Sequence, residues 1–151
     1  MDKKILSFYI ESNLFGVDIR LVKEINRNVD FTQVPDSDIS VVGLFNMRGH
    51  VVTLFNIHKF LEGNSKEIKS SNNCIILKSF DDDSNFTGFF VDSLGSVLDI
   101  DQNCIEPSPS NLENIDAHCI DGIAKLEDEL LIIIDPEKMI SEKFDFIGSA
   151  V

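Results

Sequence analysis

The sequence of 151 residues has no tryptophan, one tyrosine and three cysteines, and no hydrophobic run long enough to span a bilayer. Cys74, Cys104 and Cys119 form an odd set without C-x-x-C spacing, which disfavours a disulfide framework or a zinc site. We interpret them as reduced, buried side chains of a cytoplasmic protein. The amino terminus passes directly into a strand pattern without a secretion signal, so we expect neither a leader peptide nor direct membrane insertion.

Positive charge is also scarce, because 13 Lys and Arg face 26 Asp and Glu, which gives a formal net charge of -13. No cluster of basic residues interrupts this acidic balance. We therefore expect no nucleic-acid partner and no anionic membrane surface, and a charged partner should be basic or neutral. Hydrophobic residues make up 43% of the chain, with twelve Phe among them, which is enough for a core without metal or disulfide support.

Signatures of catalysis are missing as well. Neither G-x-S-x-G nor H-E-x-x-H occurs, and no glycine-rich loop precedes a helix. His118 and Cys119 are neighbours on an expected strand, so their side chains point to opposite faces and make a poor ligand pair. We expect no enzyme activity, no cofactor and no metal. A small cytosolic enzyme that uses His50 or His58 remains the less favoured alternative.

What the chain does contain is a hairpin pattern over residues 42–57, where Arg48-Gly49 separates two runs rich in β-branched and aromatic residues. Gly49 can adopt the positive φ of a tight turn. The second run is apolar on both sides of the strand, whereas a strand with one face in water would be polar at every second residue. We infer that one face fills a barrel and that the other meets a second barrel or a partner.

Strand-like segments with close turn signals recur along the chain and predict a mainly β fold. Residues 64–73 form the most polar stretch, which we interpret as an exposed connector between a first barrel at 1–63 and a second at 74–151. Together these form one domain over 1–151. Near the end, Asp135 is a good N-cap and Pro136 suits the first helical position, so a short helix is expected there.

Several motifs, in order and spacing, resemble the CheW-like chemotaxis coupling family. They are V-K-E-I at 22–25, Pro35, V-G-L-F-N-M-R-G-H-V-V at 42–52, G-F-F-V-D at 88–92, I-D-G at 120–122 and L-I-I-I-D at 131–135. Two positions depart from the family pattern, which usually has Pro where Thr53 stands and Asp where Asn56 stands. Both lie in the second arm of the hairpin and affect its local contacts.

The resemblance implies two packed five-stranded SH3-like barrels with a short C-terminal helix and no catalytic activity. It also implies a cytoplasmic adaptor in bacterial chemotaxis, which couples the helical tips of chemoreceptors to the regulatory domain of a sensor histidine kinase. A chain of this length without receiver or kinase segments fits the free coupling protein. A CheW-like scaffold of another signalling array, for motility or development, is the alternative.

The resemblance further suggests which residues contact partners. Four apolar residues are expected near the junction of the barrels, in a groove for the receptor helix: Val22, Ile25, Val91 and Val97. Glu24 and Arg48 each interrupt a mostly apolar strand segment. They are either two unrelated surface charges or an ion pair that braces the turn at Arg48-Gly49, which would face the kinase or the receptor.

Overall fold

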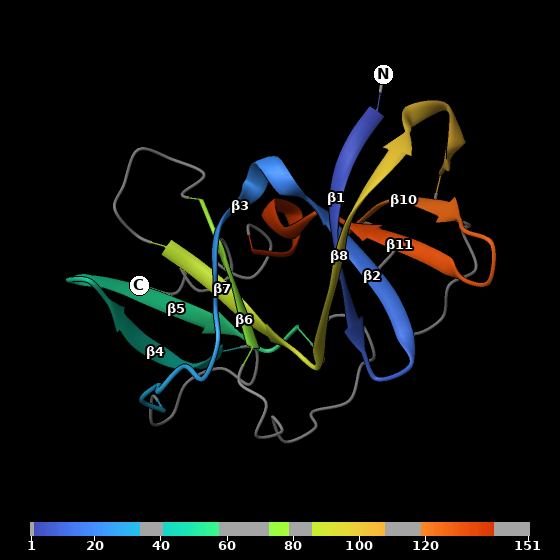
Figure 1. Ribbon diagram of the computed structural model, residues 1–151. Coiled ribbons are helices and arrows are strands. Elements are labelled where there is room, and N and C mark those ends of the chain that lie inside the picture. Colours follow the sequence, from blue (N-terminus) through green and yellow to red (C-terminus); the bar gives the residue numbers. More distant parts are fainter. Residues whose placement is uncertain (1, 34–40, 58–72, 79–85, 108–118, 141–151) are drawn as a thin grey trace.

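In the computed structural model, which describes residues 2–33, 41–57, 73–78, 86–107 and 119–140, the chain forms two β-sheets that lie side by side (Figure 1). Sheet A has six strands in the order β8 (Ser93–Asp101), β1 (Asp2–Ile10), β2 (Asn13–Asp18), β11 (Leu130–Ile134), β10 (Ile120–Lys125) and β9 (Ile105–Glu106). Sheet B has five strands in the order β3 (Val22–Asn26), β6 (Asn73–Leu77), β7 (Phe86–Val91), β5 (His50–Phe55) and β4 (Val41–Met47).

Each sheet curls into a small SH3-like barrel, as predicted. In barrel A, the 3-10 helix η2 (Gln102–Cys104) carries the chain from the edge strand β8 directly into the opposite edge strand β9. In barrel B, Thr32 follows the edge strand β3 and pairs with Leu44 of the opposite edge strand β4, through hydrogen bonds of 2.8 and 2.9 Å. The sixth strand of sheet A, β9, has only two residues, and the expectation of five strands did not include it.

The predicted division of the chain at residues 64–73 is wrong. β1 and β2 belong to sheet A with the late strands, whereas β6 and β7 belong to sheet B with β3, β4 and β5. The cause is parallel pairing, because β2 lies beside β11 and β5 lies beside β7. The polar segment therefore connects two strands of the same sheet, β5 and β6. Apart from Asn73 in β6, its residues lie outside those that the structure describes.

Three apolar clusters show why so many strands are hydrophobic on both sides. One fills barrel B (Val29, Met47, Val52, Leu54, Cys74, Ile76 and Phe90), and one fills barrel A (Ile5, Leu14, Ile100, Ala124, Leu131 and Ile133). The largest lies between the sheets and includes Phe8 and Phe15 from sheet A with Ile75, Leu77 and Phe89 from sheet B. One face of each central strand thus fills a barrel and the other face meets the second barrel.

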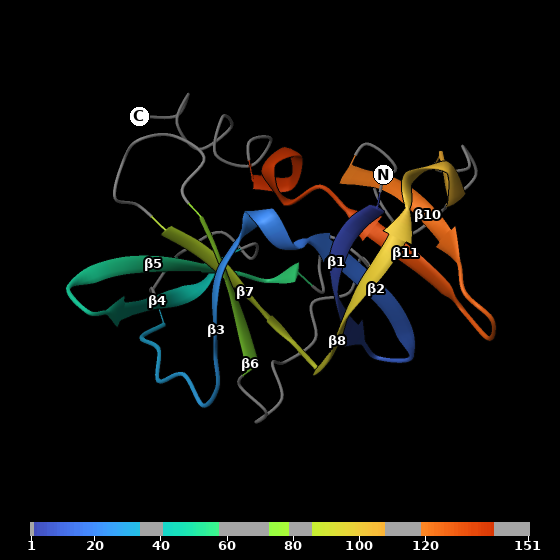
Figure 2. The same cartoon turned by 45° about the horizontal axis from the view of Figure 1, so that its top comes forward.

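The short helix begins as expected. Helical residues start at 136, and the Asp135 carboxylate accepts a hydrogen bond from the backbone N–H of Lys138 at 3.1 Å. Met139 and Ile140 are buried in the cluster between the sheets. Figures 1 and 2 both show this helical turn, in red, close to the place where the two sheets meet. The helix therefore helps to hold the barrels together.

The cysteines only partly match the expectation. Cys74 and Cys119 are buried, but Cys104 is exposed, because it lies in η2 at the surface rather than on a strand facing the core. Burial raises the pKa of the Cys74 thiol to about 12, so this side chain stays protonated and inert at neutral pH.

Candidate functional site

The turn between β4 and β5 has a backbone that few residues adopt readily. Arg48 has φ 50° and Gly49 has φ 88°, and Met47 pairs with His50 across the hairpin. Positive φ at both central residues is typical of a type I′ turn, in which Asn-Gly is the usual sequence. The amide oxygen of Asn46 accepts a hydrogen bond from the backbone N–H of Gly49 at 2.9 Å and fixes this geometry.

The structure brings Glu24 and Arg48 together, which confirms the ion pair. Arg48 Nη2 donates to Glu24 Oε2 at 2.8 Å, and the hydrogen bond from Arg48 lowers the pKa of the Glu24 carboxyl. Asn26 Nδ2 donates to the other oxygen, Glu24 Oε1, at 3.3 Å. Because β3 and β4 are the two edge strands of sheet B, the pair closes the barrel at its open edge, as the backbone pairing of Thr32 with Leu44 also does.

Two further side chains surround the same turn. Lys23 Nζ lies 4.8 Å from the centre of the Phe86 ring, and the His50 and Phe86 rings form a T-shaped pair with 5.3 Å between their centres. Phe86 is the first residue of β7 and packs against the cluster that fills barrel B. Sequence reasoning did not identify Lys23 and Phe86, because their positions in the sequence do not indicate that β3 and β7 approach at this end.

We expect the Glu24–Arg48 pair to contribute less than about 1 kcal/mol to stability, because 68% of the Arg48 side chain is exposed and water screens the attraction. A double-mutant cycle with Glu24→Ala and Arg48→Ala, followed by urea unfolding, measures this coupling directly. The double variant should lose less than the sum of the two single losses. Strictly additive losses would contradict a pair that acts as a unit.

The four residues predicted for the receptor groove are not equivalent. Ile25 on β3 and Val97 on β8 are exposed, at 39% and 49%, and each lies on an edge strand of its sheet. Val22 is partly buried against the cluster between the sheets. Val91 cannot form a surface as expected, because it is 2% exposed and belongs to that cluster. A strand covered on both faces, such as β7, has no outward side chain at this position.

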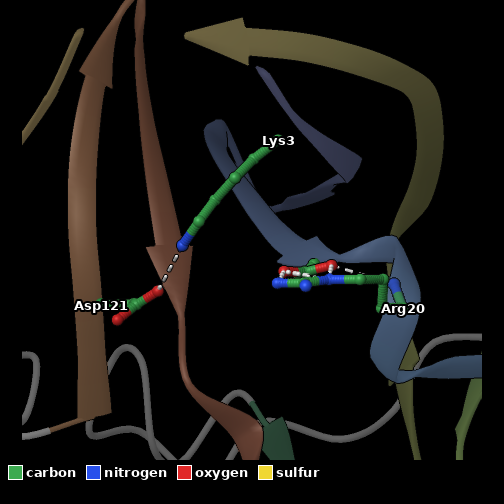
Figure 3. A network of polar contacts seen from close by, with 4 residues as sticks. Lys3, Arg20 and Asp121 are labelled. Atoms are coloured by element: carbon green, nitrogen blue, oxygen red, sulfur yellow. Dashed lines mark hydrogen bonds and ion pairs between the residues drawn. The ribbon is translucent and has the colours of Figure 1, made fainter. Parts of the chain in front are cut away.

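A second charged group lies where the chain passes from sheet A to sheet B (Figure 3). Arg20 of η1 (Ile19–Leu21) donates to both carboxylate oxygens of Asp18, with its closest contact at 2.7 Å. The hydrogen bond from Arg20 lowers the pKa of the Asp18 carboxyl. Lys3 Nζ reaches Asp121 at 3.8 Å and ties β1 to β10. The Asp18–Arg20 pair is therefore local to the link between the sheets, whereas the Lys3–Asp121 pair joins two strands of sheet A.

The residues considered for catalysis give no constellation. His50 is exposed and contacts Phe86, while His58 and His118 lie outside the described residues. In the part of the chain that the structure describes, no three His, Cys, Asp or Glu side chains are placed to hold a metal ion. Over the same ranges, no helix has the length and apolar character that crossing a membrane would require.

The two departures from the family pattern have different surroundings. Thr53 is partly buried on β5, between its partners Leu44 and Thr87. Asn56 follows β5 and is 7% exposed, and its side-chain oxygen has no hydrogen-bond donor among the described residues. A buried amide oxygen without a donor costs free energy, so Asn56 is a weak point of this hairpin arm.

Comparison with known proteins decides the family. A sequence model of the CheW-like domain matches residues 4–144. The chain belongs to the CheW-like family. It is 25% identical over 143 residues to the chemotaxis protein CheW of Treponema pallidum, covering 93% of this chain and 83% of the relative. It is 28% identical over 139 residues to the chemotaxis protein CheW of Thermotoga maritima, covering 92% and 88%.

A solved CheW-like structure agrees with the fold. The scaffolding protein TtCheW from Thermoanaerobacter tengcongensis superposes with a TM-score of 0.76 at 31% sequence identity, over 89% of this chain and 84% of that one. The CheW-like domain thus spans both barrels and the start of the helix. The family is one of non-catalytic scaffolds, so membership supports the expectation that this chain is not an enzyme.

Proposed function

We propose that this CheW-like chain is a cytoplasmic adaptor of bacterial chemotaxis, which couples the helical tips of chemoreceptors to the regulatory domain of a sensor histidine kinase. The observation that carries the proposal is the match of the CheW-like domain to residues 4–144, in a chain with the same double-barrel fold as a CheW scaffolding protein. The relatives from Treponema pallidum and Thermotoga maritima, named for chemotaxis, support the same signalling process.

The surface of the chain is compatible with this role. Ile25 and Val97 expose apolar side chains on edge strands of different sheets, and Val22 lies partly covered beneath the same side of β3. An amphipathic receptor helix could bury such residues through its apolar face. The turn at Arg48-Gly49, braced by Glu24, is the second proposed contact, and it faces the kinase or the receptor.

The proposal is tested by measuring binding of the purified chain to the kinase regulatory domain and to a receptor tip from the same genome. We expect both to bind, with stimulation of kinase activity in a reconstituted mixture. Binding only to components of a motility or developmental array would favour the alternative scaffold.

We expect Ile25→Asp and Val97→Asp to weaken receptor binding by about tenfold or more, because each would desolvate an unpaired charge in an apolar contact. Titration calorimetry with the receptor tip measures the affinity. Leu130→Asp is the matched control, since Leu130 is exposed to 54% at the far hairpin of barrel A. Equal affinity for all three variants and the wild type would disprove the groove.

A further inference from the structure

Lys23 and His50 lie against the ring of Phe86, and Arg48 pairs with Glu24 in the β4–β5 turn that leads into His50; we call Lys23, Arg48, His50 and Phe86 the Phe86 patch. This is unusual on a chain with only 13 Lys and Arg and a net charge of -13. Of the four, only Arg48 makes an ion pair within the described part of the chain.

Arg48 leaves part of its guanidinium unused. Nη2 donates to Glu24, whereas Nε and Nη1 have no acceptor among the described residues. Arg20 provides the contrast, because its Nε and Nη2 both donate to Asp18 and the carboxylate occupies that edge of the guanidinium (Figure 3). A guanidinium is planar and suited to grip a carboxylate with two donors. Arg48 is therefore braced by one carboxylate and open to another.

The backbone strengthens this argument. Arg48 has φ 50° at a turn position where Asn or Gly would be unstrained, and retaining a long basic side chain there costs conformational energy. The Phe86 ring holds Lys23 Nζ and His50 beside it, and Val51, exposed to 56%, follows His50. Arg and Phe are enriched at protein interfaces, so Arg48 and Phe86 near the exposed Val51 are typical of a protein-binding surface rather than of a solvated edge.

We propose that the Phe86 patch binds an acidic segment of a partner protein, in which one carboxylate bonds Arg48 and a second lies near Lys23 and His50. The inference rests on the proposed function, because it names the chemistry by which the kinase regulatory domain or the receptor tip meets this turn. It differs from the expectation from net charge alone, because the proposed contact on the partner is acidic although this chain as a whole is acidic.

Charge reversal tests the proposal. Lys23→Glu should weaken binding of the kinase domain or the receptor tip by about tenfold at low salt, and less as salt screens the contact. Lys23→Met, which keeps the aliphatic stem over Phe86, separates the loss of charge from the loss of packing. Lys125→Glu is the control, because it makes the same charge change on β10 in the other barrel, where Lys125 is 71% exposed.

Zero-length crosslinking identifies the partner group. A carbodiimide joins the Lys23 amine to a contacting carboxylate as an amide and takes up the water as a urea, so mass spectrometry should find Lys23 linked to a partner Asp or Glu. Lys23→Arg should keep the affinity and lose this crosslink. Circular dichroism and thermal unfolding establish that every variant is folded.

The outcomes separate the inference from the proposed function. If the wild type binds neither the kinase domain nor the receptor tip, the proposed adaptor role and the role of the Phe86 patch are both rejected. If the wild type binds and Lys23→Glu binds equally well, or if Lys125→Glu loses as much affinity, the adaptor role stands and the Phe86 patch is rejected.

Discussion

Phe8→Ala should lower the free energy of unfolding by about 3–5 kcal/mol, which is a large share of the total stability of a domain of this size. Phe8 is fully buried, and its ring lies 6.1 Å from Phe15 in sheet A and 5.5 Å from Phe89 in sheet B. Removing it opens a cavity between the two barrels rather than inside one of them.

Because this cavity lies in the shared cluster, we expect both barrels to lose stability together. Native-state amide exchange measures this, since the buried strands of both sheets should lose protection by a similar factor. Leu130→Ala, at an exposed position of sheet A, should change the stability little. Lost protection confined to β1 and β2, with sheet B unchanged, would show that the barrels unfold independently.

Gly43→Ala should destabilise the protein by about 1–3 kcal/mol and should also weaken partner binding at the β4–β5 turn. A Cβ at Gly43 would collide with the backbone carbonyl oxygen of Thr32, which cannot rotate away as a side chain could. The collision lies beside the pairing of Thr32 with Leu44 that closes barrel B. The turn that carries Arg48 belongs to the same hairpin and would shift away from Glu24.

Urea unfolding and kinase-domain affinity measure the two consequences of Gly43→Ala. Val51→Ala on the other arm of the same hairpin is the matched control for stability, because Val51 is exposed and truncating it opens no cavity. Full stability and full affinity of Gly43→Ala would mean that the closure between β3 and β4 contributes nothing.

Local patterns predicted the elements well but not their partners in space. The Arg48-Gly49 turn, the Asp135 cap and the apolar faces of the central strands follow from residue types at short spacing. The assignment of β1 and β2 to the late sheet does not, because it depends on long-range pairing: β1 pairs with β8 in antiparallel orientation and β2 pairs with β11 in parallel orientation. A polar stretch indicates an exposed connection, and it does not indicate which strands the connection joins.

In the candidate site too, local sequence patterns predicted some contacts and could not predict others. The pairing of Glu24 with Arg48 could be predicted because each charge interrupts an apolar segment, where an unpaired charge would be costly. Val91 was misplaced, since alternation alone does not show which of two covered faces a residue occupies. Lys23 and Phe86 were missed because their contact depends on β3 and β7 pairing with opposite sides of β6, which local patterns do not indicate.

The interleaved strand order has a consequence for synthesis on the ribosome. Sheet B is one uninterrupted stretch from β3 to β7, so all its strands are available once Val91 has emerged. β1 and β2 are made first, but their outer neighbours are β8 and β11, and the bond from the Ser7 hydroxyl to the Ser96 carbonyl spans 89 residues. The first hairpin of the nascent chain must therefore wait, with its edges unpaired, until the last strands arrive.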